Sequence, residues 1–267
     1  MSTLSFEDRG FTLGDGVFDT ALALGGVMIA RERHVARLLS AAQTIGIAIE
    51  HARIDAAIDA ALPATPAILR TTLTRGIAAR GLWPLSAGEP TLLVSAAPWS
   101  PALLGQPARV VTATGRRNEF SPTASLKTLG YLDHILAARE AAGAGVDDAL
   151  ILNTQGRVAC TTIANVFALM DDQLVTPPLS EGCLPGVMRA LVLQIAPSLG
   201  LEVAEVPLTR EALAGAQAAF ATNSLRFLRP IVALDGVALG SAAVLDALEQ
   251  ALFVHVEAEC GIDPRRT

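Results

Sequence analysis

One lysine stands out among the residues that could carry chemistry. Of the 20 basic residues in this 267-residue chain, Lys127 is the single lysine and the rest are arginines. A lysine amine can lose its proton and form a Schiff base, whereas an arginine does neither readily. A chain that carries its positive charge on arginine therefore keeps Lys127 either for its amine, which could attack an aldehyde, or as an ordinary exposed charge.

Two further segments could hold a phosphate group, and a third brings two basic residues together. Gly186 leads into a predicted helix, and the first N–H groups of a helix favour an anion. Residues 221–224 offer hydroxyl and amide groups at the end of a predicted strand. His34 and Arg37 lie one turn apart on the same side of another predicted helix. Each signal is weak alone, because helix starts, Ser/Thr loops and solvated helix faces are common.

The elements that carry these residues alternate in type. A 3.6-residue hydrophobic period and capping residues predict helices over 35–45, 54–62, 131–142, 185–195, 209–213 and from 241 onward. Buried or alternating runs predict strands over 67–74, 91–96, 110–113, 149–152, 166–170, 173–176, 202–206 and 218–221. Turn signals at 25–26, 171–172 and 235–236 predict hairpins. Hairpins mixed with helices indicate an α+β fold with largely antiparallel sheets.

Composition excludes several classes of protein. A hydrophobic share of 51% indicates a globular chain, and the proline-rich residues 98–107 indicate a linker between two halves. The net charge of −6 and the absence of a dense Lys/Arg run argue against nucleic-acid binding. No apolar run reaches the roughly 20 residues of a membrane span. We expect a cytoplasmic protein without an export signal or a metal site, because the three cysteines match no metal cage or redox pair.

Five motifs in chain order carry a family resemblance. They are DRGFTLGDGVFDT at 8–20, HVARL at 34–38, KTLGYLD at 127–133, NVF at 165–167 and GVMR at 186–189. Together they resemble the class IV aminotransferase family of pyridoxal-phosphate enzymes, and the resemblance covers nearly the whole chain. It implies a two-domain fold like that of D-amino-acid aminotransferase, with pyridoxal 5'-phosphate in the cleft between the domains, and a homodimer. We expect domains at 1–112 and 113–267.

The resemblance also implies roles for individual residues. Lys127 would form the Schiff base with the cofactor and then move the substrate's proton. Arg37 would bind the cofactor phosphate through its planar fork. The remaining phosphate contacts would come from the backbone N–H groups of the helix start and from the strand-end loop: Val187, Met188, Thr222, Asn223 and Ser224.

One position departs from the family pattern. Five residues before Asn165 the family carries a glutamate that keeps the pyridine nitrogen protonated, and this chain has Cys160 there. A neutral thiol cannot hold that proton, so the ring should withdraw electrons more weakly. Another group substitutes, or the reaction needs less help from the ring, or activity is lost.

The family reactions leave three alternatives. The first is 4-amino-4-deoxychorismate lyase, which releases pyruvate and 4-aminobenzoate for folate synthesis; Phe18, at a position where aminotransferases commonly carry tyrosine, resembles the lyases. The others are an aminotransferase for branched-chain or D-amino acids and a cofactor-binding homologue with little turnover. The lyase substrate has two carboxylates, and the candidates to pair with them are Arg75, Arg80 and Arg226.

Overall fold

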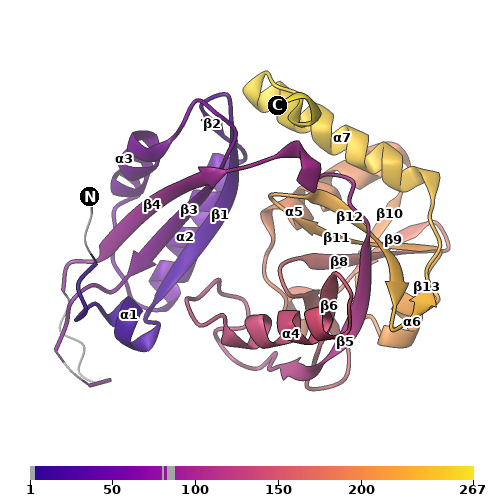
Figure 1. The fold of residues 1–267 in the computed structure, drawn as a ribbon, viewed down its shortest axis with the longest axis horizontal. Helices are drawn as coiled ribbons and strands as arrows, with labels where there is room; N and C mark the ends of the chain where they lie inside the picture. Colours follow the sequence, from indigo (N-terminus) through magenta and orange to yellow (C-terminus); the bar gives the residue numbers. More distant parts are fainter. Residues whose placement is uncertain (1–3, 80, 83–87) are drawn as a thin grey trace. The chain divides into compact units, whose positions relative to one another are not determined.

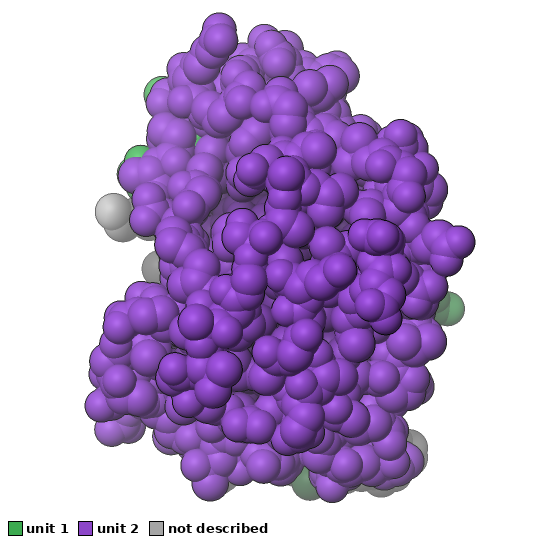
Figure 2. All heavy atoms as spheres, turned by 90° about the vertical axis from the view of Figure 1, so that its right-hand side faces the viewer, with its two compact units in different colours: residues 1–100, 126–130 green, residues 101–125, 131–267 purple. Residues whose placement is uncertain are grey.

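The chain divides into two units, each with its own sheet. The computed structural model describes residues 4–79, 81–82 and 88–267. Figure 1 traces the chain, and Figure 2 colours the two units: unit 1 is Met1–Ser100 with Leu126–Gly130, and unit 2 is Pro101–Ser125 with Tyr131–Thr267. The chain thus passes from one unit to the other at Ser100, whereas the sequence placed the boundary after residue 112. The segment that contains Lys127 belongs to unit 1.

Unit 1 is a four-stranded antiparallel sheet with helices on one face (Figure 1). The strands follow the order β2-β1-β3-β4. Their bounds are β1 Gly16–Leu24, β2 Val27–Met28, β3 Ala67–Thr74 and β4 Thr91–Pro98. The helices are α1 Arg9–Leu13, α2 Arg31–Thr44 and α3 His51–Ala61. Helix α2 packs on β1 and α3 packs on β4.

Side-chain alternation gives the two faces of this sheet different tasks. Val17 and Ala21 of β1 and Leu73 of β3 pack with α2 and α3 in one apolar core. Because successive side chains of a strand point to opposite faces, Phe18 lies on the other face. The β1–β3 register places Arg70 opposite Thr20, so Arg70 shares the face of Phe18. The helix-free face therefore carries Phe18, Thr20 and Arg70.

The Gly25-Gly26 hairpin is confirmed. Strands β1 and β2 pair antiparallel on either side of it, and both glycines have positive φ, at 56° and 78°. A two-residue turn with two positive φ angles matches the right-handed twist of its strands, and glycine adopts it without strain. This turn fixes the register of β1 with β2, in which Leu24 pairs with Val27.

Unit 2 contains a mixed sheet in the order β10-β9-β8-β11-β12-β5-β6-β7, with β13 paired to β12. Its strands are β5 Ala108–Arg117, β6 Asp148–Asn153, β7 Val158–Thr161, β8 Asn165–Met170, β9 Gln173–Thr176, β10 Glu202–Glu205, β11 Ala218–Asn223, β12 Phe227–Leu234 and β13 Val237–Ala238. Its α-helices are α4 Leu132–Gly143, α5 Val187–Ile195, α6 Arg210–Ala214 and α7 Ala243–Cys260. The α+β class is confirmed. Three pairs, β5 with β6, β5 with β12 and β9 with β10, are parallel.

Two strands of unit 2 have no predicted range, although the hairpin predicted at 235–236 implies a strand before its turn, where β12 and β13 pair. Strand β12 contains Pro230, which lacks an N–H and argues against a strand inside a sheet. Pro230 lies one residue before Ile231, where the pairing of β12 with β5 begins. Strand β7 has only four residues. Among the residues that the structure describes, no helix has the length and apolarity to cross a membrane.

Candidate active site

Lys127 lies on a short segment that packs along β1. The Phe18 N–H donates to the Lys127 carbonyl at 2.8 Å, and the Leu129 N–H donates to the Gly16 carbonyl at 3.1 Å. An isolated antiparallel bridge joins the residues between them. The backbone of the lysine is therefore fixed by the strand that the motif at 8–20 enters.

The Phe18 ring brings a second cation close to Lys127. Phe18 is 5% exposed, and the Lys127 Nζ lies 4.3 Å from its ring centroid. The Arg70 Cζ lies 3.6 Å from the same centroid. Aromatic faces attract cations within about 6 Å, so the ring orients both side chains. Sequence reasoning missed Arg70, although it is the single charged residue in strand β3.

Arg37 is oriented by a buried carboxylate. It donates from Nε to Asp19 Oδ2 at 2.8 Å and from Nη2 to Asp19 Oδ1 at 3.0 Å. The His34 Nδ1 lies 2.6 Å from the same Oδ1, and Asp19 is only 3% exposed. Burial alone would raise the pKa of Asp19, but Arg37 and His34 hold that pKa far below its usual value. The predicted basic pair thus belongs to a hydrogen-bonded triad with Asp19, which sequence reasoning did not identify.

The start of α5 is built around a glycine. An added Cβ at Gly186 would lie 2.0 Å from Asn165 Oδ1, so no other residue fits without a shift. The Asn165 amide in turn donates to the Leu184 carbonyl at 2.9 Å. The N–H groups of Val187 and Met188 lie in the first turn, where N–H groups have no partner inside a helix. Their position in the first turn would allow these N–H groups to donate to an anion.

The strand-end loop packs near this helix. Helix α5 contacts β11, and Thr222 in β11 donates from its hydroxyl to the Phe227 carbonyl at 2.5 Å. The Asn223 Oδ1 accepts the N–H groups of Leu225 and Arg226 at 3.0 Å each. The side chains of Thr222 and Asn223 therefore hold the turn between β11 and β12 in place.

Cys160 is buried and neutral. It lies on β7, is 7% exposed and packs in a cluster with α4 and Cys183. Burial raises the pKa of its thiol to about 12, and the nearby Arg117 only partly opposes this rise. At physiological pH the position that carries a carboxylate in the family pattern therefore holds no charge.

Arg117 is held by uncharged acceptors. It donates to the backbone carbonyls of Gly182 and Ala124 and lies 2.7 Å from His134 Nε2. Because a guanidinium only donates, His134 Nε2 must accept, and its Nδ1 then donates to the Thr162 carbonyl at 2.8 Å. Both ring nitrogens are used by the neutral imidazole. The surroundings of Cys160 thus contain a fixed cation beside an uncharged histidine.

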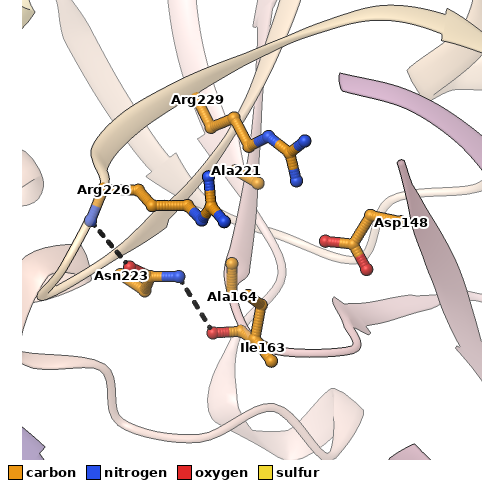
Figure 3. A pocket seen from close by; sticks show the side chains of 7 residues that line it. All are labelled: Asp148, Ile163, Ala164, Ala221, Asn223, Arg226 and Arg229. Carbon is orange, nitrogen blue, oxygen red and sulfur yellow. Dashed lines mark hydrogen bonds between the residues drawn. The ribbon is translucent and has the colours of Figure 1, made fainter. Parts of the chain in front are cut away.

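The three predicted substrate arginines have different positions. Arg75 donates to Asp15 and to the carbonyls of Ile45 and Gly46, so its donors are used inside unit 1. Arg80 lies outside the described residues. Arg226 lies in unit 2 in a small pocket with Arg229 and Asp148 (Figure 3).

This pocket lies on a different sheet face from Thr222. Ala221 lines the pocket and belongs to the apolar core of the sheet. Thr222 follows it directly, and neighbouring strand residues point to opposite faces. Arg226 is therefore not on the side of β11 to which the Thr222 hydroxyl points.

Comparisons with known proteins agree with the motifs. A family model for amino-transferase class IV matches residues 16–234. The chain is 33% identical to a putative branched-chain-amino-acid aminotransferase of Methanocaldococcus jannaschii, over 90% of this chain and 86% of that protein. It is 30% identical to the aminodeoxychorismate lyase of Vibrio harveyi, over 84% of each.

A solved structure gives the same result for the fold. A putative 4-amino-4-deoxychorismate lyase from Legionella pneumophila superposes with a TM-score of 0.88 at 28% identity, covering 96% of both chains. The family match spans most of the sequence and includes both aminotransferases and lyases among the relatives. The chain belongs to the class IV aminotransferase family of pyridoxal-phosphate-dependent enzymes.

Proposed function

We propose that this enzyme is a 4-amino-4-deoxychorismate lyase that releases pyruvate and 4-aminobenzoate. The observation that carries the proposal is the neutral, buried thiol of Cys160. Without a carboxylate at this position the ring of the cofactor is a weaker electron sink. A reaction whose product becomes aromatic supplies driving force of its own, so the lyase reaction suffers least from this change.

The donor set fits pyridoxal phosphate. Unit 1 offers the Lys127 amine for an aldehyde and the oriented Arg37 guanidinium for a phosphate. Unit 2 offers the first N–H groups of α5 and the loop at residues 222–224. When bound, the cofactor supplies an electron sink for a carbanion at the amino-bearing carbon. In this proposal these residues bind and orient it.

Lys127 acts as the base. Its Nζ takes the proton from the carbon that bears the substrate's amino group. The C–O bond to the enolpyruvyl group then breaks, the ring becomes aromatic, and the departing enolpyruvate takes up a proton to become pyruvate. The Phe18 ring at 4.3 Å keeps the amine oriented throughout.

Arg70 is the candidate to orient a substrate carboxylate. It shares the Phe18 ring with Lys127, which places a guanidinium close to the reacting amine. Guanidinium groups pair with carboxylates through two parallel hydrogen bonds. Arg70→Gln should therefore raise KM more than it lowers kcat.

The second candidate is an aminotransferase. The 33% identity to a putative branched-chain-amino-acid aminotransferase favours it. An aminotransferase converts an amino acid to a keto acid and gains no aromatic product. The neutral Cys160 would then slow the proton transfer, because the electron sink is weaker.

A product assay separates the two candidates. Purified enzyme loaded with pyridoxal phosphate is incubated with 4-amino-4-deoxychorismate, and 4-aminobenzoate and pyruvate are measured. Equal amounts of both products support the lyase. In a second assay, branched-chain and D-amino acids are incubated with 2-oxoglutarate. Formation of a keto acid there, without 4-aminobenzoate in the first assay, contradicts the lyase and supports the aminotransferase.

Two variants of Lys127 test its role. Lys127→Ala should abolish turnover and the visible absorbance of lysine-bound cofactor, because no other residue of the chain is a lysine. Lys127→Arg keeps the positive charge but cannot form a Schiff base, so it should be equally inactive. Borohydride reduction followed by peptide mapping should find the adduct on Lys127. An adduct elsewhere, or activity in Lys127→Arg, would contradict the assignment.

A further inference from the structure

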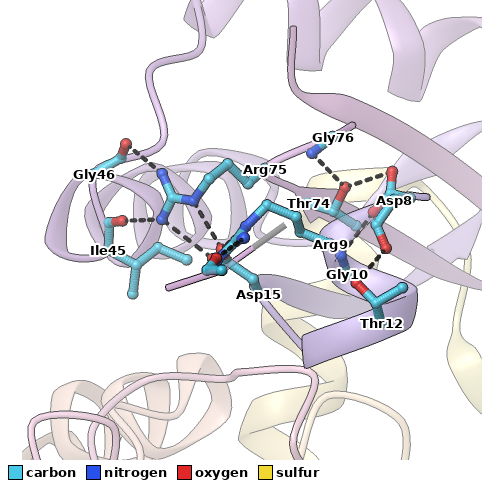
Figure 4. Close-up of polar contacts among 11 residues, drawn as sticks. Asp8, Arg9, Gly10, Thr12, Asp15, Ile45, Gly46, Thr74, Arg75 and Gly76 are labelled. Carbon is cyan, nitrogen blue, oxygen red and sulfur yellow. Dashed lines mark hydrogen bonds and ion pairs between the residues drawn. The ribbon is translucent and has the colours of Figure 1, made fainter. Parts of the chain in front are cut away.

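An ion triad stands at the start of β1 (Figure 4). Asp15 Oδ2 accepts from Arg9 Nε and from Arg75 Nε, each at 2.8 Å, and Asp15 Oδ1 accepts from Arg75 Nη2 at 3.1 Å. The three side chains are 5%, 15% and 11% exposed, for Arg9, Asp15 and Arg75. Burial alone would raise the pKa of Asp15, but Arg75 and Arg9 lower it below its usual value. The triad is thus a charged cluster that stays ionised.

The triad joins segments that are distant in sequence. Arg75 also donates to the carbonyls of Ile45 at 2.6 Å and Gly46 at 2.9 Å, in the connection between α2 and α3. Arg9 donates from Nη1 to the Gly81 carbonyl at 2.7 Å. Arg75 therefore links Asp15 to the helix connection and the end of β3, and Arg9 links Asp15 to α1. Asp15 cannot move without breaking several charge-assisted hydrogen bonds.

Gly16, the residue after Asp15, connects the triad to the segment that contains Lys127. The Gly16 carbonyl accepts the Leu129 N–H at 3.1 Å, and two residues along the strand Phe18 donates to Lys127. Gly16 is closely packed: an added Cβ would lie 2.5 Å from the Leu73 carbonyl oxygen and 2.9 Å from Leu129 Cδ1. The backbone between Asp15 and the Lys127 segment is therefore closely packed, so a shift of Asp15 would also shift this segment.

We infer that Arg9, Asp15 and Arg75 form a positioning device for Lys127. The triad fixes the start of β1, and β1 holds residues 126–130 by the two backbone hydrogen bonds. Loosening Asp15 lets this segment detach from β1 and moves the amine away from the Phe18 ring. The inference rests on the proposed role of Lys127 for its catalytic meaning, but its structural part does not depend on cofactor binding.

The test compares two carboxylates of similar environment. Asp15→Asn removes the centre of the triad. The matched control is Asp235→Asn in unit 2, because Asp235 is 20% exposed and accepts from Arg210 and from the Thr112 N–H and hydroxyl. Amide hydrogen exchange is measured at Phe18 and Leu129 in protein without cofactor. We expect about tenfold faster exchange in Asp15→Asn and little change in Asp235→Asn, even where both variants lose similar thermal stability.

A second readout uses the cofactor-loaded enzyme. The pH at which the visible band of lysine-bound cofactor shifts should move in Asp15→Asn and stay unchanged in Asp235→Asn. Arg75→Lys keeps a charge near Asp15 and should give intermediate effects, and it also serves if Asp15→Asn fails to fold. Equal exchange at Leu129 in wild type and Asp15→Asn, or the same acceleration in both carboxylate variants, would overturn the inference. If the wild type forms no adduct at Lys127, the proposed function fails, while the exchange result still decides on the positioning.

Discussion

Charged groups are fixed in opposite ways around the Lys127 segment of unit 1 and around Cys160 of unit 2. In unit 1, carboxylates hold the arginines: Asp15 lies between Arg9 and Arg75, and Asp19 binds Arg37. These carboxyl groups have lowered pKa values, so they remain ionised while folded.

In unit 2, the arginine near Cys160, Arg117, has no carboxylate partner among the residues that the structure describes. Arg117 donates to two backbone carbonyls and to neutral His134, next to the neutral thiol of Cys160. Ion pairs hold the groups around Lys127 in place, whereas burial and hydrogen bonds to uncharged acceptors hold the groups around Cys160. The difference predicts that removing a carboxylate from unit 1 lowers the free energy of unfolding. It also predicts that ionising the Cys160 thiol lowers it.

The largest expected effect is on stability, in Asp19→Asn. This change leaves Arg37 beside a neutral amide in a buried place, and breaking a buried ion pair by removing one partner costs about 3–5 kcal/mol. Arg117→Gln in unit 2 loses hydrogen bonds to neutral acceptors, which should cost about 1–3 kcal/mol. Urea unfolding followed by circular dichroism gives both values. A smaller loss in Asp19→Asn than in Arg117→Gln would break the comparison.

Asp19→Asn should also change the response to acid. The folded pKa of Asp19 lies below its ordinary value of 3.8, so the unfolded chain binds this proton first. The stabilisation is therefore present above about pH 3.8 and is lost as the pH falls toward the folded pKa. The variant should have a flatter acid limb in a plot of unfolding free energy against pH.

The second prediction concerns alkaline pH and Cys160. Burial raises the pKa of this thiol from 9.0 to about 12, so above pH 9 the unfolded chain loses a proton that the folded chain keeps. Stability then falls with rising pH, by up to about 1.4 kcal/mol per pH unit for one proton. Cys160→Ala should remove this slope between pH 9 and pH 12.

Cys260→Ala provides the control for the alkaline slope. Cys260 is only partly buried, whereas Cys160 is buried. The control should therefore change the slope much less. Equal changes in the two variants would mean that burial of Cys160 does not set its charge.

Local signals in the sequence predicted much of the fold. Strand β3 at 67–74 and the glycine hairpin follow from hydrophobic alternation and from the φ angles that glycine allows. Thr209 caps α6 as predicted, since its side chain accepts from the Ala212 N–H. Pro230 argues against a long strand before the hairpin at 235–236, and only the structure shows that the pairing of β12 with β5 begins one residue later, at Ile231.

The site was less predictable because its partners are distant in sequence. Lys127 stands out by residue type alone, but Arg70 approaches it only through the register of β1 and β3. Arg75 is a candidate substrate residue by its type, but the structure pairs it with Asp15, which is 60 residues away in sequence. A motif in the sequence marks which residues matter, and the tertiary contacts decide whether an arginine binds a ligand or another part of the chain.

The smallest expected effect on the unfolding free energy comes from Arg226, which lies near another arginine, in contrast to Arg75, which pairs with Asp15. Burial and the neighbouring Arg229 lower the pKa of Arg226, and the nearby carboxylate of Asp148 accepts from Thr162 and Ala149. No hydrogen-bond acceptor for the Arg226 guanidinium lies among residues 4–79, 81–82 and 88–267.

Arg226→Gln removes a repulsion and no ion pair, so the unfolding free energy should stay within about 0.5 kcal/mol of wild type or rise slightly. Arg75→Gln, measured in parallel, loses bonds to Asp15 and should cost about 1–3 kcal/mol. A loss in Arg226→Gln as large as that in Arg75→Gln would mean that the pocket arginine is also structural, and the contrast between the two units would not extend to it.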